Sequence, residues 1–260
     1  MALKDQLGVF SWFSLMTKDT RAATNFYTEL LGWTTTEFEI PGHGASLIYA
    51  AAGQTFGNPV AMGDEYQMPA HWIPYITVED VDHACKKSKK FGGKVAVPAF
   101  DIPSIGRTAV LTDPVGAAFH IYTPEDKNEN MKMTGDQPGQ VCWLELMIND
   151  PALLIPYYSE MFGWKMSEPV DMNGGQYHSF EACGDQAGGI MKRPPQVPET
   201  PPAWMTYMCV ENVDRTNEKV ASLGGTVVMP KTMIPDTGFF SLIQDPTGAH
   251  FYTFEFQKPS

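Results

Sequence analysis

The sequence predicts an α+β protein of two tandem domains, each a pair of βαβββ modules that form one curled mixed sheet. Three observations predict it: the two halves of the chain match at a nearly constant offset, each half holds two amphipathic helices that end at glycine, and short aromatic-rich strands lie between turn residues. The length of 260 residues fits one large domain or two small ones.

The internal repeat defines the domains. At an offset of 131, the Trp12 segment matches the Trp143 segment and FYTELLGW aligns with YYSEMFGW. At an offset of 132, VEDVD at 78–82 matches VENVD at 210–214, and DPVGA at 113–117 matches DPTGA at 245–249. We therefore expect domains at 1–126 and 140–260. The polar segment 127–139, which has no apolar periodicity, is expected to be the linker.

The first module is expected to begin with a strand at 9–16. Asp19 is a plausible N-cap for a helix over 20–31, which has apolar residues at helical spacing and ends at Gly32. Strands are expected near 33–39, 45–51 and 59–62.

The second module is expected to open with a strand at 72–78. A helix over 82–91, capped by Asp80 or Asp82, ends at Gly92-Gly93, and strands follow near 94–100, 106–112 and 117–122. The second half of the chain repeats this order. One βαβββ unit cannot bury its sheet alone, and two paired units form a cup that can hold a ligand.

Charge and composition exclude several classes of partner. The formal net charge of −12 argues against nucleic acid and anionic membranes as partners. The sequence has no apolar run long enough for a transmembrane helix and no secretory signal at its start. The four scattered cysteines are typical of reduced thiols. We expect a cytoplasmic monomer or homodimer with a small-molecule ligand.

The repeated motifs resemble those of a known family. FYTELLGW and YYSEMFGW, the helices VEDVD…FGG and VENVD…LGG, and the turns DPVGA and DPTGA are similar to the vicinal oxygen chelate superfamily, in its tandem glyoxalase-like branch. That superfamily includes glyoxalase I, bleomycin-resistance and fosfomycin-resistance proteins, and extradiol dioxygenases. The resemblance implies the fold; the fold hosts isomerases, dioxygenases, thiol transferases and pure drug binders.

The resemblance also implies where metal ligands would stand. Metal-dependent members carry His, Gln or Glu on the first strand of each module and on two later strands. Those places hold Trp12 and Trp143, Ile73 and Met205, His120 and Tyr252, and the stretches near Ala61-Met62 and Gly189-Ile190. Only His120 is a metal donor, and a catalytic metal needs about three protein ligands. We predict no metal site and no cofactor.

Strand alternation predicts which side chains face the cups instead. The expected ligand-binding residues are Trp12, Ser14 and Tyr75 in the first domain, and Trp143, Trp204, Tyr207 and Tyr252 in the second. Such aromatic walls suit a flat or apolar small molecule.

Two residues are candidates for catalysis. Glu145 lies in the apolar strand CWLELMI, where desolvation would raise its pKa and make it a general base. The alternative is a structural hydrogen bond to a tyrosine or the backbone. His120 is a candidate acid or base, with a satisfied core histidine as the alternative. One of Tyr177 and His178 faces the cup, and alternation does not say which.

Two functions remain open at this stage. The protein is expected to act on or bind a small hydrophobic or carbonyl-containing molecule, as a metal-independent member of the lyase or isomerase type if it is an enzyme. The alternative is non-catalytic sequestration of a drug-like ligand. The pairing of modules is also open: each domain closes its own cup, or the first module meets the fourth and the second meets the third.

Overall fold

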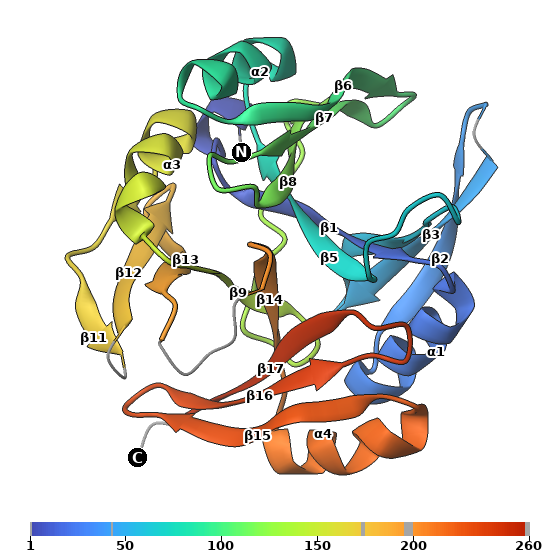
Figure 1. The fold of residues 1–260 in the computed structure, drawn as a ribbon. Helices are drawn as coiled ribbons and strands as arrows, with labels where there is room; N and C mark the ends of the chain where they lie inside the picture. Colours follow the sequence, from blue (N-terminus) through green and yellow to red (C-terminus); the bar gives the residue numbers. More distant parts are fainter. Residues whose placement is uncertain (1, 43, 173–174, 195–199, 258–260) are drawn as a thin grey trace.

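Each half of the chain forms its own sheet in the computed structural model, which describes residues 2–42, 44–172, 175–194 and 200–257 (Figure 1). The first sheet has the strand order β2-β3-β4-β1-β5-β8-β7-β6, and the second has the order β10-β12-β13-β9-β14-β17-β16-β15, with β11 paired to β12. In both sheets the first strands of the two modules pair antiparallel, β1 with β5 and β9 with β14. The modules therefore pair within each domain, and the exchanged pairing is ruled out.

The first domain contains two helices and the strands of the first sheet. Its elements are β1 (Phe10–Thr17), α1 (Thr20–Leu31), β2 (Thr34–Ile40), β3 (Gly44–Ala51), β4 (Gln54–Ala61), β5 (His71–Thr77), α2 (Val81–Lys90), β6 (Lys94–Ile102), β7 (Gly106–Thr112) and β8 (Ala118–Pro124).

The second domain repeats this order. Its elements are β9 (Val141–Ile148), α3 (Ile155–Phe162), β10 (Lys165–Met166), β11 (Val170–Met172), β12 (Gly175–Ala182), β13 (Asp185–Lys192), β14 (Trp204–Cys209), α4 (Val213–Val220), β15 (Thr226–Ile234), β16 (Gly238–Gln244) and β17 (His250–Phe256). Short 3₁₀ turns at Leu3–Asp5, Pro151–Leu153 and Ala221–Leu223 complete the described structure.

The helix boundaries follow from the predicted caps. The Asp19 side chain accepts a hydrogen bond from the Ala22 N–H, and Gly32 ends α1 with a φ of 69°. Asp80, not Asp82, caps α2, since its carboxylate accepts from the His83 N–H. The expectation of a strand only at 59–62 is wrong: β4 already begins at Gln54, because Ala52 and Gly53 both adopt positive φ and close a tight β3–β4 hairpin.

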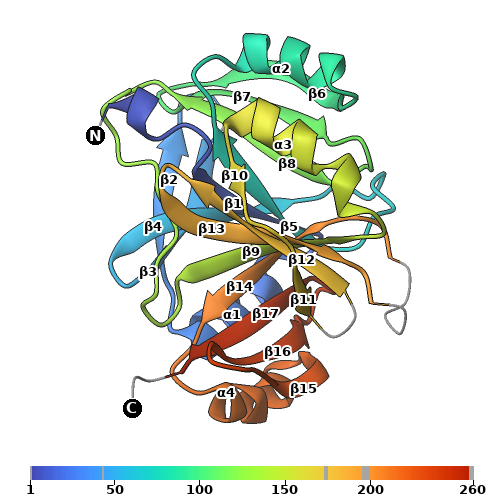
Figure 2. The ribbon, with the colours of Figure 1, turned by 90° about the vertical axis from the view of Figure 1, so that its left-hand side faces the viewer.

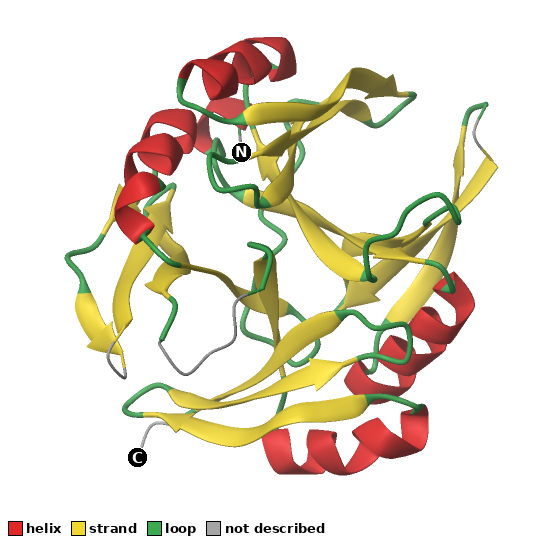
Figure 3. Cartoon of the chain, viewed as in Figure 1, coloured by secondary structure: helices red, strands yellow, loops and turns green. Residues whose placement is uncertain are grey.

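The helices pack against each other across the domain boundary, although each sheet is formed by one domain alone. Helix α1 packs beside α4, and α2 packs beside α3, so that Figure 3 shows two helix pairs at opposite ends of the molecule. Between them, the central strands β5 and β14 lie against each other (Figure 2). Each pair thus contains one helix from each domain.

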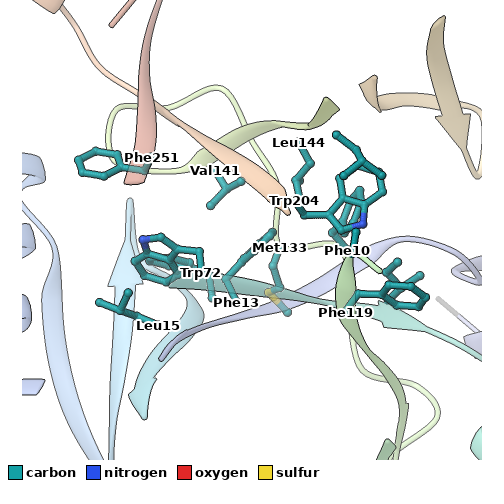
Figure 4. Close-up of a cluster of buried hydrophobic side chains, with 14 of the residues drawn as sticks. Phe10, Phe13, Leu15, Trp72, Phe119, Met133, Val141, Leu144, Trp204 and Phe251 are labelled. Atoms are coloured by element: carbon teal, nitrogen blue, oxygen red, sulfur yellow. The ribbon is translucent and has the colours of Figure 1, made fainter. Parts of the chain in front are cut away.

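One hydrophobic core runs through both domains. Figure 4 shows Phe13, Leu15 and Phe119 of the first domain in one buried cluster with Leu144 and Phe251 of the second. Burial of apolar area at about 25 cal/mol per Å² is the main stabilising term of such a cluster. The two sheets therefore face each other with their apolar sides, and the opposite side of each sheet remains for the cup.

The DPxG turns connect the domains through buried hydrogen bonds. The Asp113 Oδ1 accepts from three backbone N–H groups of its own turn, and its Oδ2 accepts from the Tyr158 hydroxyl at 2.9 Å. The Tyr158 oxygen in turn accepts from the Trp204 Nε1–H at 3.1 Å. The matching residues repeat this chain, since Trp72 donates to Tyr27 at 2.9 Å and Tyr27 donates to Asp245 at 3.1 Å.

The segment between the domains is packed against both of them. The Met133 N–H donates to the Phe10 carbonyl, and the Trp33 Nε1–H donates to the Gly139 carbonyl at 2.7 Å. Met131 and Met133 are buried. The segment that the sequence predicts to be a linker therefore packs against the domains through backbone hydrogen bonds and buried methionine side chains. No helix in the described residues is long and apolar enough to cross a membrane.

We predict that Tyr158→Phe lowers the free energy of unfolding by about 2 kcal/mol, because it leaves a buried carboxylate and a buried indole N–H each short of a partner. Chemical denaturation would measure the loss. Tyr66→Phe is the matched control, since Tyr66 is 52% exposed. Equal stabilities of the two variants would contradict a structural role for the Tyr158 hydroxyl.

Candidate functional site

The cup face of each sheet is the side that points away from the interdomain core. In β1, Phe13 and Leu15 are buried in that core, so alternation directs Trp12 and Ser14 to the opposite side. The same reasoning applies to β9, where Leu144 and Leu146 face the core and Trp143 and Glu145 face the cup. We call these sides the first cup and the second cup.

An aromatic row crosses the first cup over three strands. Trp12 of β1 pairs with Tyr75 of β5, and Tyr75 pairs with His120 of β8. The rings of Tyr75 and His120 stack with their centroids 3.9 Å apart and their planes 8° apart. Three of the residues predicted for this cup therefore stand side by side.

Asn58 is the hydrogen-bond acceptor for Trp12 and Ser14 in the first cup. Its side-chain oxygen accepts from the Trp12 Nε1–H at 2.8 Å and from the Ser14 hydroxyl at 2.8 Å. Asn58 lies opposite Ser14 in the β1–β4 ladder. The sequence interpretation placed this position near Ala61-Met62 and missed Asn58. The repeat offset of 131, carried on through β4, would have found it.

His120 is a buried, neutral residue. Its Nδ1 lies 3.1 Å from the Thr108 hydroxyl, which gives its one proton to the Ile121 carbonyl at 2.9 Å. The His120 Nδ1 must therefore be the donor of this pair, which leaves Nε2 as an acceptor. Burial lowers the pKa of His120 to about 3, so the ring is uncharged and weakly basic at neutral pH.

The second cup repeats the row with a different last residue. Trp143 pairs with Tyr207 across β9 and β14, and Tyr207 pairs with Tyr252 across β14 and β17. The two tyrosine rings stack with their centroids 4.4 Å apart. Phe240 and Phe254 pack around them. At the strand β17 the second cup is lined by Tyr252 and Phe254, and it is more apolar there than the first cup is at β8, where His120 stands.

Tyr177 takes over the position that Asn58 has in the first cup. Gly189 lies opposite Glu145, as Asn58 lies opposite Ser14. A Cβ on Gly189 would lie 2.0 Å from the Tyr177 hydroxyl, so only glycine leaves room for that group. The Trp143 Nε1–H donates to the Tyr177 hydroxyl at 2.7 Å. This decides the open alternative: Tyr177 reaches the cup, and His178 lies near the Ser167 carbonyl.

Glu145 lies on the cup side of β9, two residues after Trp143, and it is only 8% exposed. Burial raises the pKa of its carboxyl to about 7, and a hydrogen bond with the Tyr207 hydroxyl partly opposes that shift. The carboxyl is therefore present in both protonation states near neutral pH. A group in this condition can both accept and return a proton.

The tyrosines around Glu145 remain protonated. Burial, followed by the nearby Glu145 charge, raises the pKa of Tyr207 and that of Tyr177 above the ordinary tyrosine value. Tyr252 is shifted in the same direction, since burial and Glu145 raise its pKa. The second cup therefore presents phenolic hydroxyl groups as hydrogen-bond donors beside one carboxyl group.

Trp204 does not lie in this cup. It is 2% exposed and packs in the interdomain core against Trp164 and Phe180, while its N–H donates to Tyr158. Trp204 and Tyr207 are three residues apart on β14, which places them on opposite sides of the sheet. The other residues predicted to bind ligand, Trp12, Ser14, Tyr75, Trp143, Tyr207 and Tyr252, lie on the cup sides.

The two domains match one family. The glyoxalase/bleomycin resistance protein/dioxygenase superfamily matches the chain twice, over residues 9–121 and 140–252. The chain belongs to this superfamily. The resemblance stated from the sequence motifs is confirmed, as is the fold of two tandem glyoxalase domains.

Two relatives match nearly the full length of this chain. The chain is 34% identical over 250 residues to CFP32 of Mycobacterium bovis, a protein provisionally named as a glyoxylase, with 94% of this chain and 93% of the relative covered. It is 29% identical over 272 residues to the anthracycline biosynthesis protein DnrV of Streptomyces peucetius, with 96% and 94% covered.

Solved structures show the same superfamily fold at low identity. The 2,3-dioxygenase LapB from Pseudomonas sp. KL28 is similar with a TM-score of 0.64 at 16% identity, covering 98% of this chain and 95% of LapB. The Mn(II)-bound glyoxalase from Novosphingobium aromaticivorans is similar with a TM-score of 0.64 at 13% identity, covering 96% and 82%.

The donor set of the cups does not fit the metal that many superfamily members hold. The described residues contain no group of three or more His, Cys, Asp or Glu side chains placed to hold a metal ion. In the first cup the residue paired with Ser14 on the next strand is Ile73, and in the second cup the residue paired with Glu145 is Met205. Isoleucine, and the thioether of methionine, are not ligands for hard divalent cations.

We predict that the buried Glu145 carboxyl makes the protein less stable as the pH rises. Its pKa is about 7 in the folded state and 4.5 in the reference state, so the folded protein holds the extra proton between these values. The free energy of unfolding should therefore fall by about 3 kcal/mol from pH 4.5 to pH 7 and above.

Denaturant unfolding of wild type and of Glu145→Gln across this pH range measures the effect. The difference between the two proteins isolates Glu145, because the amide does not titrate. A constant difference across the range would contradict a raised pKa at this site.

Proposed function

We propose that the second cup binds a small molecule with an apolar or aromatic body and a carbonyl group, and that Glu145 acts on it as a metal-independent acid–base catalyst of the lyase or isomerase type. The observation that carries this proposal is the buried Glu145 carboxyl with a pKa of about 7, set among tyrosine hydroxyl groups. The aromatic walls supply the apolar contact that such a ligand needs.

The chemistry follows from the two kinds of group present. The Glu145 carboxylate accepts a proton from the carbon next to the ligand's carbonyl group, and the electron pair of the broken C–H bond moves to the carbonyl oxygen. The Tyr177 hydroxyl, whose oxygen accepts from the Trp143 Nε1–H, donates a hydrogen bond to that oxygen as its charge develops, while the Tyr207 hydroxyl donates to Glu145. Return of the proton from Glu145 to a different atom of the ligand completes an isomerisation.

The relatives support the class of chemistry and of ligand. One is provisionally named as a glyoxylase, and another is named for the biosynthesis of anthracyclines, which are aromatic compounds. Both matches cover more than nine tenths of this chain and of the relative, so the comparison extends over both cups.

The first cup favours a second function, sequestration of an aromatic ligand without turnover. Its row of Trp12, Tyr75 and His120 has the same aromatic character as the second cup. However, Ser14 stands in the place of Glu145, and burial lowers the pKa of His120 to about 3. This cup therefore offers an acceptor nitrogen and hydroxyl groups to a ligand, without a group that exchanges protons at neutral pH.

We predict that the wild-type protein accelerates exchange of the α-hydrogens of 2-tetralone, an aromatic ketone, in heavy water, and that Glu145→Gln slows this exchange at least on the order of 100-fold. Proton NMR measures the rate. Because the carboxylate is the active form, the rate should rise with pH through a midpoint near 7.

The control is Glu168→Gln, which removes an exposed carboxylate outside the cups and should leave the rate unchanged. Binding of 2-tetralone, followed by tryptophan fluorescence, should survive in Glu145→Gln. Exchange at the wild-type rate in that variant would overturn the acid–base role. Binding to the wild type without any exchange would instead support sequestration.

A further inference from the structure

His120 offers an unused hydrogen-bond acceptor to the first cup. The residue is 9% exposed, and its ring stacks on Tyr75. Its Nδ1–H is engaged with the Thr108 hydroxyl, and no described residue donates to its Nε2. This Nε2 keeps contact with solvent, because it is not one of the fully covered unpaired atoms of the described chain. A ligand that covers Nε2 must therefore donate a hydrogen bond to it or leave a buried acceptor unpaired.

Asn58 offers the opposite kind of group to the same cup. Its side-chain oxygen accepts from the Trp12 Nε1–H, which can only donate, so the orientation of the amide is fixed. The Ser14 hydroxyl donates to the same oxygen, which thereby has two donors. No described residue accepts from the Asn58 NH2 group. The donors of this amide are therefore left for a ligand.

An aromatic surface separates the two groups. Asn58 lies on β4 and His120 on β8, and the strands β1 and β5 lie between them. Neighbouring strands are about 4.8 Å apart, so β4 and β8 are roughly 14 Å apart along the curled sheet. Trp12 of β1 and Tyr75 of β5 stand in the interval. A flat bicyclic or tricyclic body with one polar substituent at each end matches this length and this surface.

The side chains of this row favour a neutral ligand. Trp12, Ser14 and Asn58 carry no charge, and burial raises the pKa of Tyr75 above its ordinary value, so its phenol stays protonated. Burial also lowers the pKa of His120 to about 3, so its ring is uncharged at neutral pH. A carboxylate or an ammonium group would lose its hydration here without gaining an opposite charge from the row.

We propose that the first cup recognises a neutral, flat aromatic ligand with a hydroxyl group at one end, which donates to the His120 Nε2, and a carbonyl group at the other, which accepts from the Asn58 NH2 group. This ligand class rests on the proposed sequestration in the first cup and is independent of Glu145. The second cup lacks both groups, because Tyr252 and Gly189 stand at the matching positions.

Three related compounds test the ligand class on the full chain. The neutral 6-acetyl-2-naphthol carries both substituents, 6-methoxy-2-acetonaphthone lacks the hydroxyl donor, and 2-naphthol lacks the carbonyl group. At mildly acidic pH, we expect the first compound to bind on the order of ten-fold more tightly than either analogue. The Trp12 indole N–H resonance in proton NMR measures these affinities, so binding in the second cup does not enter them.

A second reading on the wild-type protein shows the hydrogen bond itself. Nitrogen NMR of protein labelled at its histidines should show the His120 Nε2 resonance moving to lower frequency with 6-acetyl-2-naphthol, and moving less with the methoxy compound. Equal affinities of the three compounds, or an unmoved Nε2 resonance in the bound state, would overturn the ligand class while sequestration stands. Binding of none of them would overturn the ligand class and sequestration in the first cup together.

Two variants assign the two ends of the ligand. His120→Phe keeps an aromatic ring beside Tyr75 and removes the acceptor, so it should bind the naphthol ketone and its methoxy analogue equally. Asn58→Asp keeps oxygen acceptors for Trp12 and Ser14 and removes the NH2 group, so it should lose the preference for the ketone over 2-naphthol. A variant that folds and keeps its preference would overturn the assignment of that end. The wild-type measurements do not depend on the folding of either variant.

Discussion

The structure depends on two buried tyrosine–carboxylate hydrogen bonds that cross between the domains. Tyr158 of the second domain donates to Asp113 of the first, and Tyr27 of the first donates to Asp245 of the second. Each aspartate also holds the backbone of its own DPxG turn. A buried carboxylate is costly unless it is fully hydrogen-bonded, so these groups are satisfied only when both domains are in place.

This constraint decides which side of each sheet becomes a cup. Trp72 and Trp204 donate to the same tyrosines, so their sides of β5 and β14 must face the domain interface. Tyr75 and Tyr207, three residues later, then face the opposite way. The two cups differ in their polar residues. In the first cup, Asn58 accepts from Trp12; in the second cup, the equivalent residue is Gly189, and the Tyr177 hydroxyl occupies the free space and accepts from Trp143. The carboxyl of Glu145 stands only in the second.

The sequence was sufficient for the fold because the repeat carries its structural residues twice. The matches of FYTELLGW with YYSEMFGW and of DPVGA with DPTGA contain both tyrosine–aspartate partners, although their contact across domains was not foreseen. Alternation correctly placed Trp12, Tyr75 and Glu145 on one side of their strands. It gave no position for Tyr177, because that side chain reaches the cup through the gap at Gly189, and a missing side chain leaves little sequence signal. Trp204 was misplaced because an aromatic residue suits a core as well as a ligand site.

The central claim is that the second cup holds a carboxyl group that changes protonation near neutral pH. Infrared difference spectroscopy of wild type against Glu145→Gln tests it most directly, since a protonated carboxyl group has a carbonyl stretch that the carboxylate lacks. We expect a single such band that disappears with a midpoint near pH 7. A band that disappears near pH 4.5, the ordinary value for glutamic acid, would contradict the account.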